Sequence, residues 1–255
     1  MTIALGYRCI DGFVLATDSY ESDGITKKMV DKIWSYEVQD SWGIAIASAG
    51  EADLADSFNE SLREVLGNSD FDHAKLMAKL KLAIASTRRT YPESQLSMLI
   101  GVYGQPAAGF HVASLYRVYD ASMHLGPVTG HQSLGIGASV SKFLCEHAYG
   151  MTVHVAEAAR MAVFTIARVK EHVDGCDGPT SMITYTRDKI NASFKIWGRP
   201  EIDSIEAELN AKDFRAAFNE YWKAHNPPFV FPGGKNEPSY GGSVRWTRTA
   251  KLGTK

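Results

Sequence analysis

The chain has 255 residues, of which 45% are hydrophobic and 22% are charged, and its formal net charge is -2. This length suits one large domain or two small ones, and the apolar fraction is too high for a disordered chain. The near-neutral charge argues against a nucleic-acid platform, and no apolar run is long enough to span a membrane. The N-terminus does not resemble a signal peptide, and the 3 cysteines form no CxxC pair. We therefore expect a cytoplasmic protein without nucleic-acid or membrane partners.

The hydrophobic pattern predicts strands and paired helices in alternation along the chain. Apolar alternation and Gly, Pro and Asp turns predict strands at 2–18 (a hairpin), 33–38, 42–49, 97–103, 109–115, 116–123, 181–185 and 192–197. Helical spacing predicts helices at about 54–65, 72–91, 140–147, 153–173 and 203–224. Paired helices argue against a doubly wound parallel sheet, where single helices alternate with strands. The predicted fold is α+β, a four-layer αββα sandwich of two antiparallel sheets.

The C-terminal end of the chain differs in composition from the rest. Asp203 and Glu206 form a capping-box pattern that predicts the start of the last helix. Beyond it, residues 226–255 are rich in Pro and Gly and end in basic residues. We expect one domain over residues 1–225 and a C-terminal extension over 226–255. The extension's composition fits both a mobile tail and an arm that lies on a neighbouring subunit.

Common cofactor and metal motifs are missing from the sequence. GxxxxGK[ST], HExxH and GxSxG do not occur, and GIGASV at 135–140 fits a tight strand-to-helix turn better than a phosphate loop. The loop with His172, Asp174, Cys176 and Asp177 holds metal-ligand types, but its spacing favours a structural loop over a cation site. We expect no metal and no cofactor.

Residues 2–50 carry the most informative pattern. Thr2 opens the strand TIALGYR, Asp18 ends FVLATDS, Lys32 lies in VDKIW, and SAGEADLAD leads into a helix. This order resembles the proteasome β-subunits and their bacterial relatives, the N-terminal-nucleophile (Ntn) peptidases, and the resemblance extends over about residues 2–198. It implies a threonine endopeptidase that acts on peptides or proteins and assembles as a homo-oligomeric ring. Whether an ATPase unfoldase joins the ring is left open.

The resemblance gives roles to several of these residues. A threonine hydroxyl needs a base, and an N-terminal threonine carries its own α-amine, with an ordinary pKa of about 7.7–8.0. Removal of Met1 would expose the amine of Thr2. Lys32 would stabilise the ionised hydroxyl, Asp18 would hold Lys32, and the backbone N–H of Ala49 would serve the oxyanion. The alternative for Asp18 and Lys32 is a buried structural ion pair.

The sequence departs from the family near the amine. Ile136 stands where the family has a serine that contacts the threonine amine. In the late loop Asp174 and Gly178 match the family, but Asp177 replaces a second serine. A carboxylate at this position would raise the pKa of the α-amine or bind it as a salt bridge.

Five further positions resemble the family's substrate groove and first pocket. Ala47 suggests a roomy pocket and Glu51 a preference for basic side chains, although both also fit packing or helix-start roles. The positions are Tyr20, Ser22, Val30, Ala47 and Glu51.

Two other functions remain open at this point. One keeps the fold and the nucleophile but acts on small amides, as an Ntn amidohydrolase. The other is a non-catalytic, ring-forming structural subunit, which Ile136 and Asp177 favour.

Overall fold

The structure is a computed structural model of the whole chain. It describes residues 2–22, 27–38, 42–66, 71–92, 96–105, 111–119, 124–148, 153–187 and 192–211. The end of the predicted last helix and the C-terminal extension lie outside these ranges. Across the ranges given, no helix is long and apolar enough to cross a membrane.

The first sheet is built around the N-terminal hairpin. β1 (Ile3–Cys9) and β2 (Gly12–Thr17) pair antiparallel, and the predicted turn at Asp11-Gly12 joins them. A side chain at Gly12 would have its Cβ 1.8 Å from the Tyr185 carbonyl oxygen, so the turn requires glycine. The strand order is β10 (His131–Gly135), β1 (Ile3–Cys9), β2 (Gly12–Thr17), β11 (Ser181–Arg187) and β12 (Ala192–Ile196).

The second sheet follows the chain order and is antiparallel throughout. Its strands are β5 (Ile33–Val38), β6 (Trp42–Gly50), β7 (Leu96–Gly104), β8 (Val112–Tyr119) and β9 (His124–Pro127). A separate small ladder pairs β3 (Tyr20–Ser22) with β4 (Lys27–Met29).

One strand prediction in this region was wrong. The sequence suggested separate runs at 109–115 and 116–123, but β8 passes through Leu115 and Tyr116 without a break. Continuous pairing with β7, from Gly104 opposite Val112 to Met98 opposite Val118, holds the two halves in one strand. The short strands β9 and β10 were not predicted.

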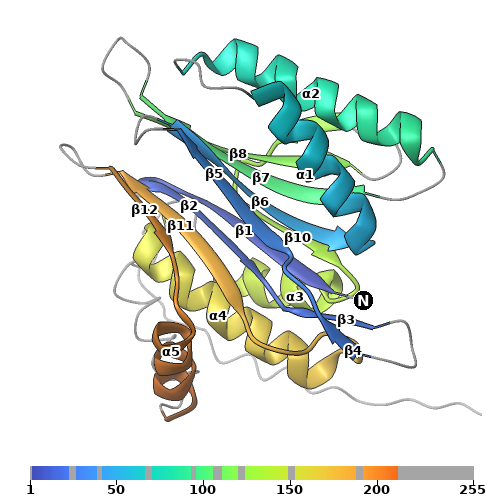
Figure 1. Cartoon of the computed structure of the whole chain (residues 1–255). Coiled ribbons are helices and arrows are strands. Elements are labelled where there is room, and N and C mark those ends of the chain that lie inside the picture. Colours follow the sequence, from blue (N-terminus) through green and yellow to red (C-terminus); the bar gives the residue numbers. More distant parts are fainter. Residues whose placement is uncertain are drawn as a thin grey trace, which may run out of the picture. The chain divides into compact units, whose positions relative to one another are not determined.

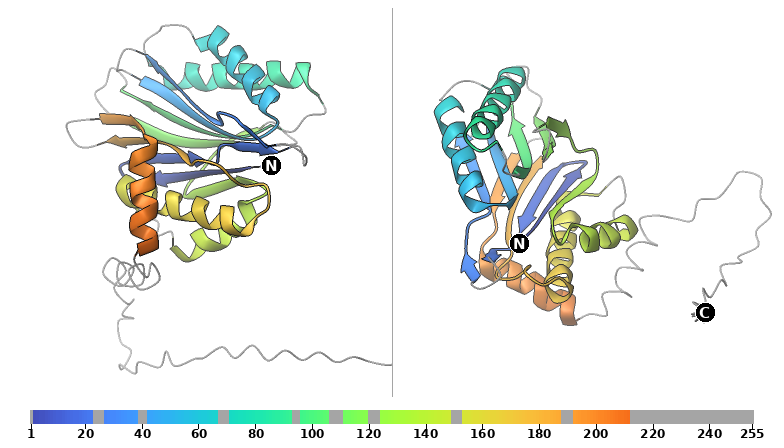
Figure 2. Two further views of the ribbon diagram at one scale, coloured as in Figure 1. Left: turned by 60° about the horizontal axis from the view of Figure 1, so that its bottom comes forward. Right: turned by 90° about the vertical axis from the view of Figure 1, so that its right-hand side faces the viewer.

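The helices form the outer layers of the sandwich (Figures 1 and 2). α1 (Ala52–Leu66) and α2 (His73–Thr90) cover the second sheet, while α3 (Ala138–Ala148) and α4 (Val155–His172) cover the first. α5 (Arg199–Ala211) lies against α4. This arrangement confirms the predicted α+β, four-layer αββα fold.

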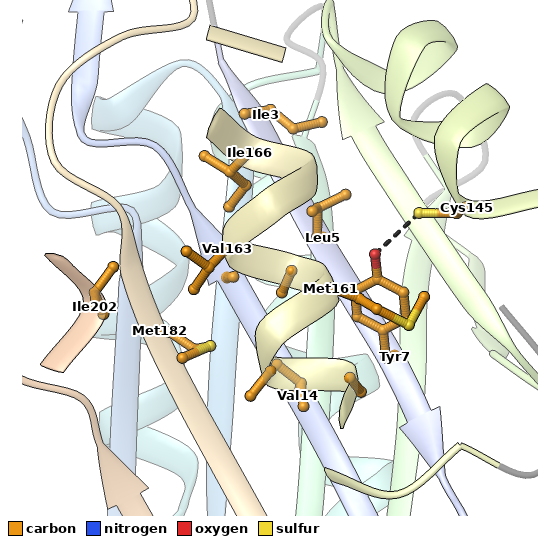
Figure 3. Close-up of a cluster of buried hydrophobic side chains, with 14 of the residues drawn as sticks. Ile3, Leu5, Tyr7, Val14, Cys145, Met161, Val163, Ile166, Met182 and Ile202 are labelled. Carbon is orange, nitrogen blue, oxygen red and sulfur yellow. Dashed lines mark hydrogen bonds between the residues drawn. The ribbon is translucent and has the colours of Figure 1, made fainter. Parts of the chain in front are cut away.

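Three apolar layers hold the sandwich together. One lies between α1, α2 and the second sheet, one between the two sheets, and one between α4 and the first sheet. Figure 3 shows the last of these, with Ile166 and Val163 of α4 above Leu5 and Val14. Each large aliphatic side chain buried in this way contributes about 1.5–3 kcal/mol.

The last helix begins earlier than predicted. α5 starts at Arg199 rather than Asp203, and the Gly198 N–H donates to the Glu201 carboxylate at 3.0 Å. Pro200 is compatible with this start because a helix's first-turn N–H groups have no intrahelical partner. Asp203 instead lies one turn in, 3.7 Å from the Arg199 guanidinium.

Candidate active site

Thr2 lies immediately before β1, at the end of the inter-sheet layer marked N in Figure 1. Only 3% of its surface is exposed. Gly135 approaches the Thr2 backbone so closely that an added Cβ would lie 2.2 Å from the Thr2 carbonyl oxygen. Gly135 also has a φ of +90°, so glycine is required there on two grounds.

Asp18 is the centre of the site. It follows β2, is fully buried, and its Oδ1 accepts hydrogen bonds from the Thr2 hydroxyl at 2.5 Å and the Ile3 N–H at 3.1 Å. The same oxygen lies 2.9 Å from the Lys32 ammonium. Its second oxygen, Oδ2, accepts the Asp177 N–H at 3.2 Å. These charge-assisted bonds compensate a carboxylate that would otherwise be costly to bury.

Lys32 provides the positive charge of the site. Its side chain is 7% exposed and donates to both Asp18 and the Tyr20 carbonyl oxygen. Its own carbonyl accepts the Ser48 N–H at 2.9 Å, which ties it to β6. Because the hydroxyl of Thr2 and the ammonium of Lys32 share one carboxylate oxygen, the three predicted residues form a single buried cluster.

The loop after α4 closes the cluster from the side. The Tyr20 N–H donates to the Asp177 carbonyl at 3.2 Å, and the Asp177 side chain accepts the Gly178 N–H at 2.7 Å. Gly178 has a φ of +83°, and an added Cβ would lie 2.8 Å from the Tyr20 ring. Asp177 therefore belongs to the cluster through its backbone. Asp174, the other carboxylate predicted here, is exposed, whereas the groups that donate to Asp18 come from Thr2, Ile3, Lys32 and Asp177.

The sheet register determines which backbone N–H is available for an oxyanion. The Ser48 N–H donates towards β5, to the Lys32 carbonyl, so the next residue in the strand must direct its N–H and C=O towards β7. Ala49 is paired with Ser97 there, and the sheet uses the amide that was expected to serve the oxyanion. The Gly50 N–H belongs to the same trans peptide unit as the Ala49 carbonyl, so it points the opposite way, back towards the Lys32 side.

The five predicted substrate positions lie in different settings. Tyr20 and Ser22 are in β3, and the Val30 N–H donates to the Ser19 carbonyl at 2.9 Å. Ala47 is fully buried in the inter-sheet layer, and Glu51 is exposed at the start of α1, where its carbonyl accepts the Ala55 N–H. The side chain of Ser22 lies outside the description.

Two residues of the site were not singled out from the sequence in this role. The Ser19 hydroxyl donates to the Pro179 carbonyl at 2.7 Å and so fastens the loop to the end of β2. The Cys176 thiol is 2% exposed, and burial together with the Asp18 carboxylate raises its pKa to about 11. Ser19 directly follows Asp18 and could have been found from that position, whereas no spacing signals Cys176. In the ranges described, no three His, Cys, Asp or Glu side chains are placed to hold a metal ion.

The two antiparallel five-stranded sheets between helix layers have the arrangement of the proteasome-like sandwich fold. Among solved structures, the chain is similar to Anbu proteins, also described as ancestral β-subunits. A Gly-1 mutant of Anbu from Hyphomicrobium sp. strain MC1 aligns with a TM-score of 0.69 and 15% identity, covering 86% of this chain and 97% of that one. A helical assembly of the Anbu complex from Pseudomonas aeruginosa aligns at 0.65 and 16% identity, over 94% and 100%. Anbu from Yersinia bercovieri aligns at 0.65 and 14% identity, over 92% and 100%.

At these identities the similarity concerns the fold. No family model and no curated protein matches the sequence.

Proposed function

We propose that this protein is a threonine-type peptidase whose nucleophile is the Thr2 hydroxyl, exposed at the N-terminus by removal of Met1. One observation carries the proposal: the Thr2 hydroxyl and the Lys32 ammonium meet on a single buried oxygen of Asp18. A structural ion pair needs only the Asp18–Lys32 contact. The addition of a hydroxyl from the second residue of the chain is what an N-terminal nucleophile requires.

The proposed reaction uses the chain's own groups in sequence. The α-amine of Thr2 takes the hydroxyl proton as Oγ1 forms a bond to the carbonyl carbon of the substrate. The Gly50 N–H, rather than that of Ala49, stabilises the resulting oxyanion. The amine then returns the proton to the leaving nitrogen as the C–N bond breaks, leaving an ester on Thr2. Water, deprotonated by the same amine, then attacks the ester carbonyl carbon; the C–Oγ1 bond breaks, the amine returns the proton to Oγ1, and the acyl product leaves as a carboxylic acid.

Lys32 favours this sequence electrostatically. Its ammonium lies on the same carboxylate oxygen as the Thr2 hydroxyl, so its positive charge favours the ionised oxygen during attack. Asp18 holds Lys32 and the hydroxyl together through bonds from separate elements, which reduces the reorganisation needed at the moment of reaction.

The proposal extends to the substrate and to the assembly of the protein. We propose peptide or protein substrates, bound beside the β3–β4 ladder, and a homo-oligomer in the cytoplasm. The helical assembly of the Pseudomonas aeruginosa protein, which has this fold, supports self-association. An amidohydrolase acting on small amides would use the same cluster, and a substrate panel of casein-derived peptides against short acyl amides separates the two.

A non-catalytic structural subunit is the competing function. It is favoured by Ile136, which is 44% exposed where the family has its amine-binding serine. Intact mass of the purified protein is the first discriminating measurement, because retained Met1 leaves no free amine on Thr2.

Reaction with a threonine-directed electrophile, followed by peptide mass mapping, tests the nucleophile directly. We expect one adduct on Thr2 in the wild type and in Thr2→Ser, and none in Thr2→Ala. Thr90→Ala is the matched control, since Thr90 is an exposed threonine of α2 and should not affect labelling. Peptidase activity retained in Thr2→Ala, with an unchanged circular dichroism spectrum, would refute the assignment.

A further inference from the structure

The loop that joins α4 to β11 forms one wall of the catalytic cluster. Its Asp177 N–H donates to the Asp18 carboxylate, and its Asp177 carbonyl accepts the Tyr20 N–H, both at 3.2 Å. Two glycines of this loop, Gly175 and Gly178, have φ values of +89° and +83°. Glycine is conformationally permissive, so a loop shaped by two glycines needs contacts outside itself to keep one conformation.

Two hydrogen bonds fasten the end of this loop, directly before β11. The Lys170 ammonium donates to the Thr180 hydroxyl oxygen at 2.8 Å, and the Thr180 hydroxyl donates to the Glu206 carboxylate at 3.2 Å. Thr180 is 6% exposed, and its hydroxyl both accepts and donates a bond. The direction of both bonds is fixed, because an ammonium can only donate and an ionised carboxylate can only accept.

The outer members of this chain of hydrogen bonds come from two helices that pack together. α4 and α5 share the apolar cluster that includes Ile202, and Arg160 of α4 pairs with Glu208 of α5 at 2.9 Å. Lys170 of α4 and Glu206 of α5 therefore attach the loop to a packed pair of helices. The sequence suggested Glu206 as part of a capping box, but α5 begins earlier than predicted and the Glu206 carboxylate bonds the loop instead.

The position of Lys170 exceeds what its helix needs. A lysine in the last turn of a helix complements the helix dipole, and an exposed side chain is sufficient for that. Lys170 is half-buried, and burial lowers the pKa of its ammonium. Four carboxylates oppose this shift, namely Glu206, Asp18, Asp177 and Asp203. Lys170 therefore loses part of its hydration in a position from which its charge acts on α5 and on the catalytic cluster.

We propose that this chain of hydrogen bonds, from Lys170 through Thr180 to Glu206, positions the loop for the reaction. The loop holds one oxygen of Asp18 through a backbone N–H, and the other oxygen is left for the nucleophile and its lysine. A carboxylate held at both oxygens is restrained from turning, which keeps the hydroxyl in place for attack. The effect on the reaction rests on the proposed function, whereas the effect on the loop does not.

Hydrogen exchange of the full-length protein, measured by mass spectrometry, tests the effect on the loop. Thr180→Val keeps the side-chain shape but removes both hydrogen bonds, so peptides that carry the Asp177 and Tyr20 amides should exchange about tenfold faster. Thr180→Ser keeps the hydroxyl and should exchange like wild type. Thr87→Val is the matched control, since Thr87 is fully buried in α2 and its hydroxyl donates to the Ala83 carbonyl. Wild-type exchange in Thr180→Val would overturn the proposal.

Lys170→Met and Glu206→Met provide a second route to the same answer if Thr180→Val fails to fold. Each removes one of the two bonds at a half-buried position and keeps an unbranched side chain suited to a helix. Both should speed exchange of the loop peptides in the same direction as Thr180→Val. Wild-type exchange in both variants would overturn the proposal.

Peptidase kinetics test the effect on the reaction. In Thr180→Val, kcat should fall about tenfold with a smaller change in KM, because the loop acts on the nucleophile's carboxylate. Thr180→Ser should restore kcat, and Thr87→Val should leave it unchanged even where its melting temperature falls as far. Faster exchange in Thr180→Val with wild-type kcat would refute the positioning role.

Failure of this inference can be distinguished from failure of the proposed function. Absence of the electrophile adduct on Thr2 in the wild type would refute the proposed function, and hydrogen exchange would still decide whether the chain of hydrogen bonds holds the loop. A labelled Thr2 in the wild type, with unchanged exchange and kcat in Thr180→Val, would refute this inference and leave the proposed function intact.

Discussion

The two ends of the inter-sheet layer differ in chemistry, although the same strand, β2, connects them. At one end Phe13 stacks on Tyr185 with ring centroids 5.8 Å apart, and Tyr103 stacks on Tyr185 at 4.5 Å and on Phe194 at 5.0 Å. At the other end, immediately after β2, the layer ends in the charged Asp18 cluster. Between them the inward-facing residues of β6 are small, namely Ala45, Ala47 and Ala49.

The difference indicates how the fold combines stability with a polar site. Large stacked rings bury much apolar surface and close one end of the layer. Small alanines then let the sheets approach each other, and the charged groups occupy the end where the strands stop and backbone groups become available. The aromatic end should therefore contribute mainly stability, and the charged end mainly chemistry.

Asp18→Asn should give the largest effect, because it should lower both the stability of the protein and its proposed activity. The Lys32 ammonium would lose its buried counter-ion, which costs about 3–5 kcal/mol, and the proposed peptidase activity should fall below detection. Urea unfolding monitored by tryptophan fluorescence gives the stability change. A variant within 1 kcal/mol of wild type would mean that the ion pair behaves like an exposed one.

Lys32→Met keeps much of the side-chain length but removes the charge. Because Lys32 is proposed to stabilise the ionised Thr2 oxygen, kcat/KM should fall by about 10²–10³-fold or more. Lys32→Arg is the control, because it keeps the positive charge but places it in a different geometry. A near-normal rate in the Met variant would show that Lys32 has only a structural role.

Tyr185→Leu tests the aromatic end. Its ring is 1% exposed and stacks on both Phe13 and Tyr103, so its loss should destabilise the protein by about 1–3 kcal/mol. We expect kcat/KM to stay within about twofold of wild type, because the change lies at the far end of β2 from Asp18. A large loss of activity with unchanged stability would contradict this division of roles.

Much of the fold on which this comparison depends could be predicted from the sequence. The N-terminal hairpin, the 33–49 hairpin and the buried face of α4, including Ala162 and Ile166, follow from apolar periodicity that the structure confirms. The convergence of Thr2, Asp18 and Lys32 came from a resemblance, since local pattern alone cannot bring residues from three segments together.

Other features depend on tertiary pairing and could not be predicted. β9 and β10 are short and carry little apolar alternation, so they are strands only because β8 and β1 supply partners. The direction of the Gly50 amide depends on which neighbour takes the Ser48 and Ala49 amides, and thus on the register of β6. The proposed change of oxyanion donor from Ala49 to Gly50 is a shift of one residue that follows from the strand register and not from the sequence pattern.

Asp177→Ser tests the charged end through the pH dependence of activity. A carboxylate near the α-amine stabilises its protonated form, so the neutral base appears only at higher pH. Replacing Asp177 with the family's serine should move the acidic limb of the kcat/KM profile to lower pH by up to about one unit. The wild-type profile and that of Asp174→Ser, at an exposed position, are the controls; an unshifted limb would show that the Asp177 carboxylate does not act on the amine.

Cys176, behind the Asp18 cluster, should give the smallest effect. Its thiol pKa is raised from 9.0 to about 11, chiefly by burial and then by the Asp18 carboxylate. The folded state therefore retains this proton when the unfolded state has already lost it, and the stabilisation is complete below pH 9 and is lost as the pH rises towards 11. Between these values the free energy of unfolding should fall more steeply for wild type than for Cys176→Ala, in which the other buried thiols, Cys9 and Cys145, are unchanged. Parallel pH profiles for the two proteins would mean that the thiol titrates alike in the folded and unfolded states, and that Asp18 exerts no influence beyond its own hydrogen bonds.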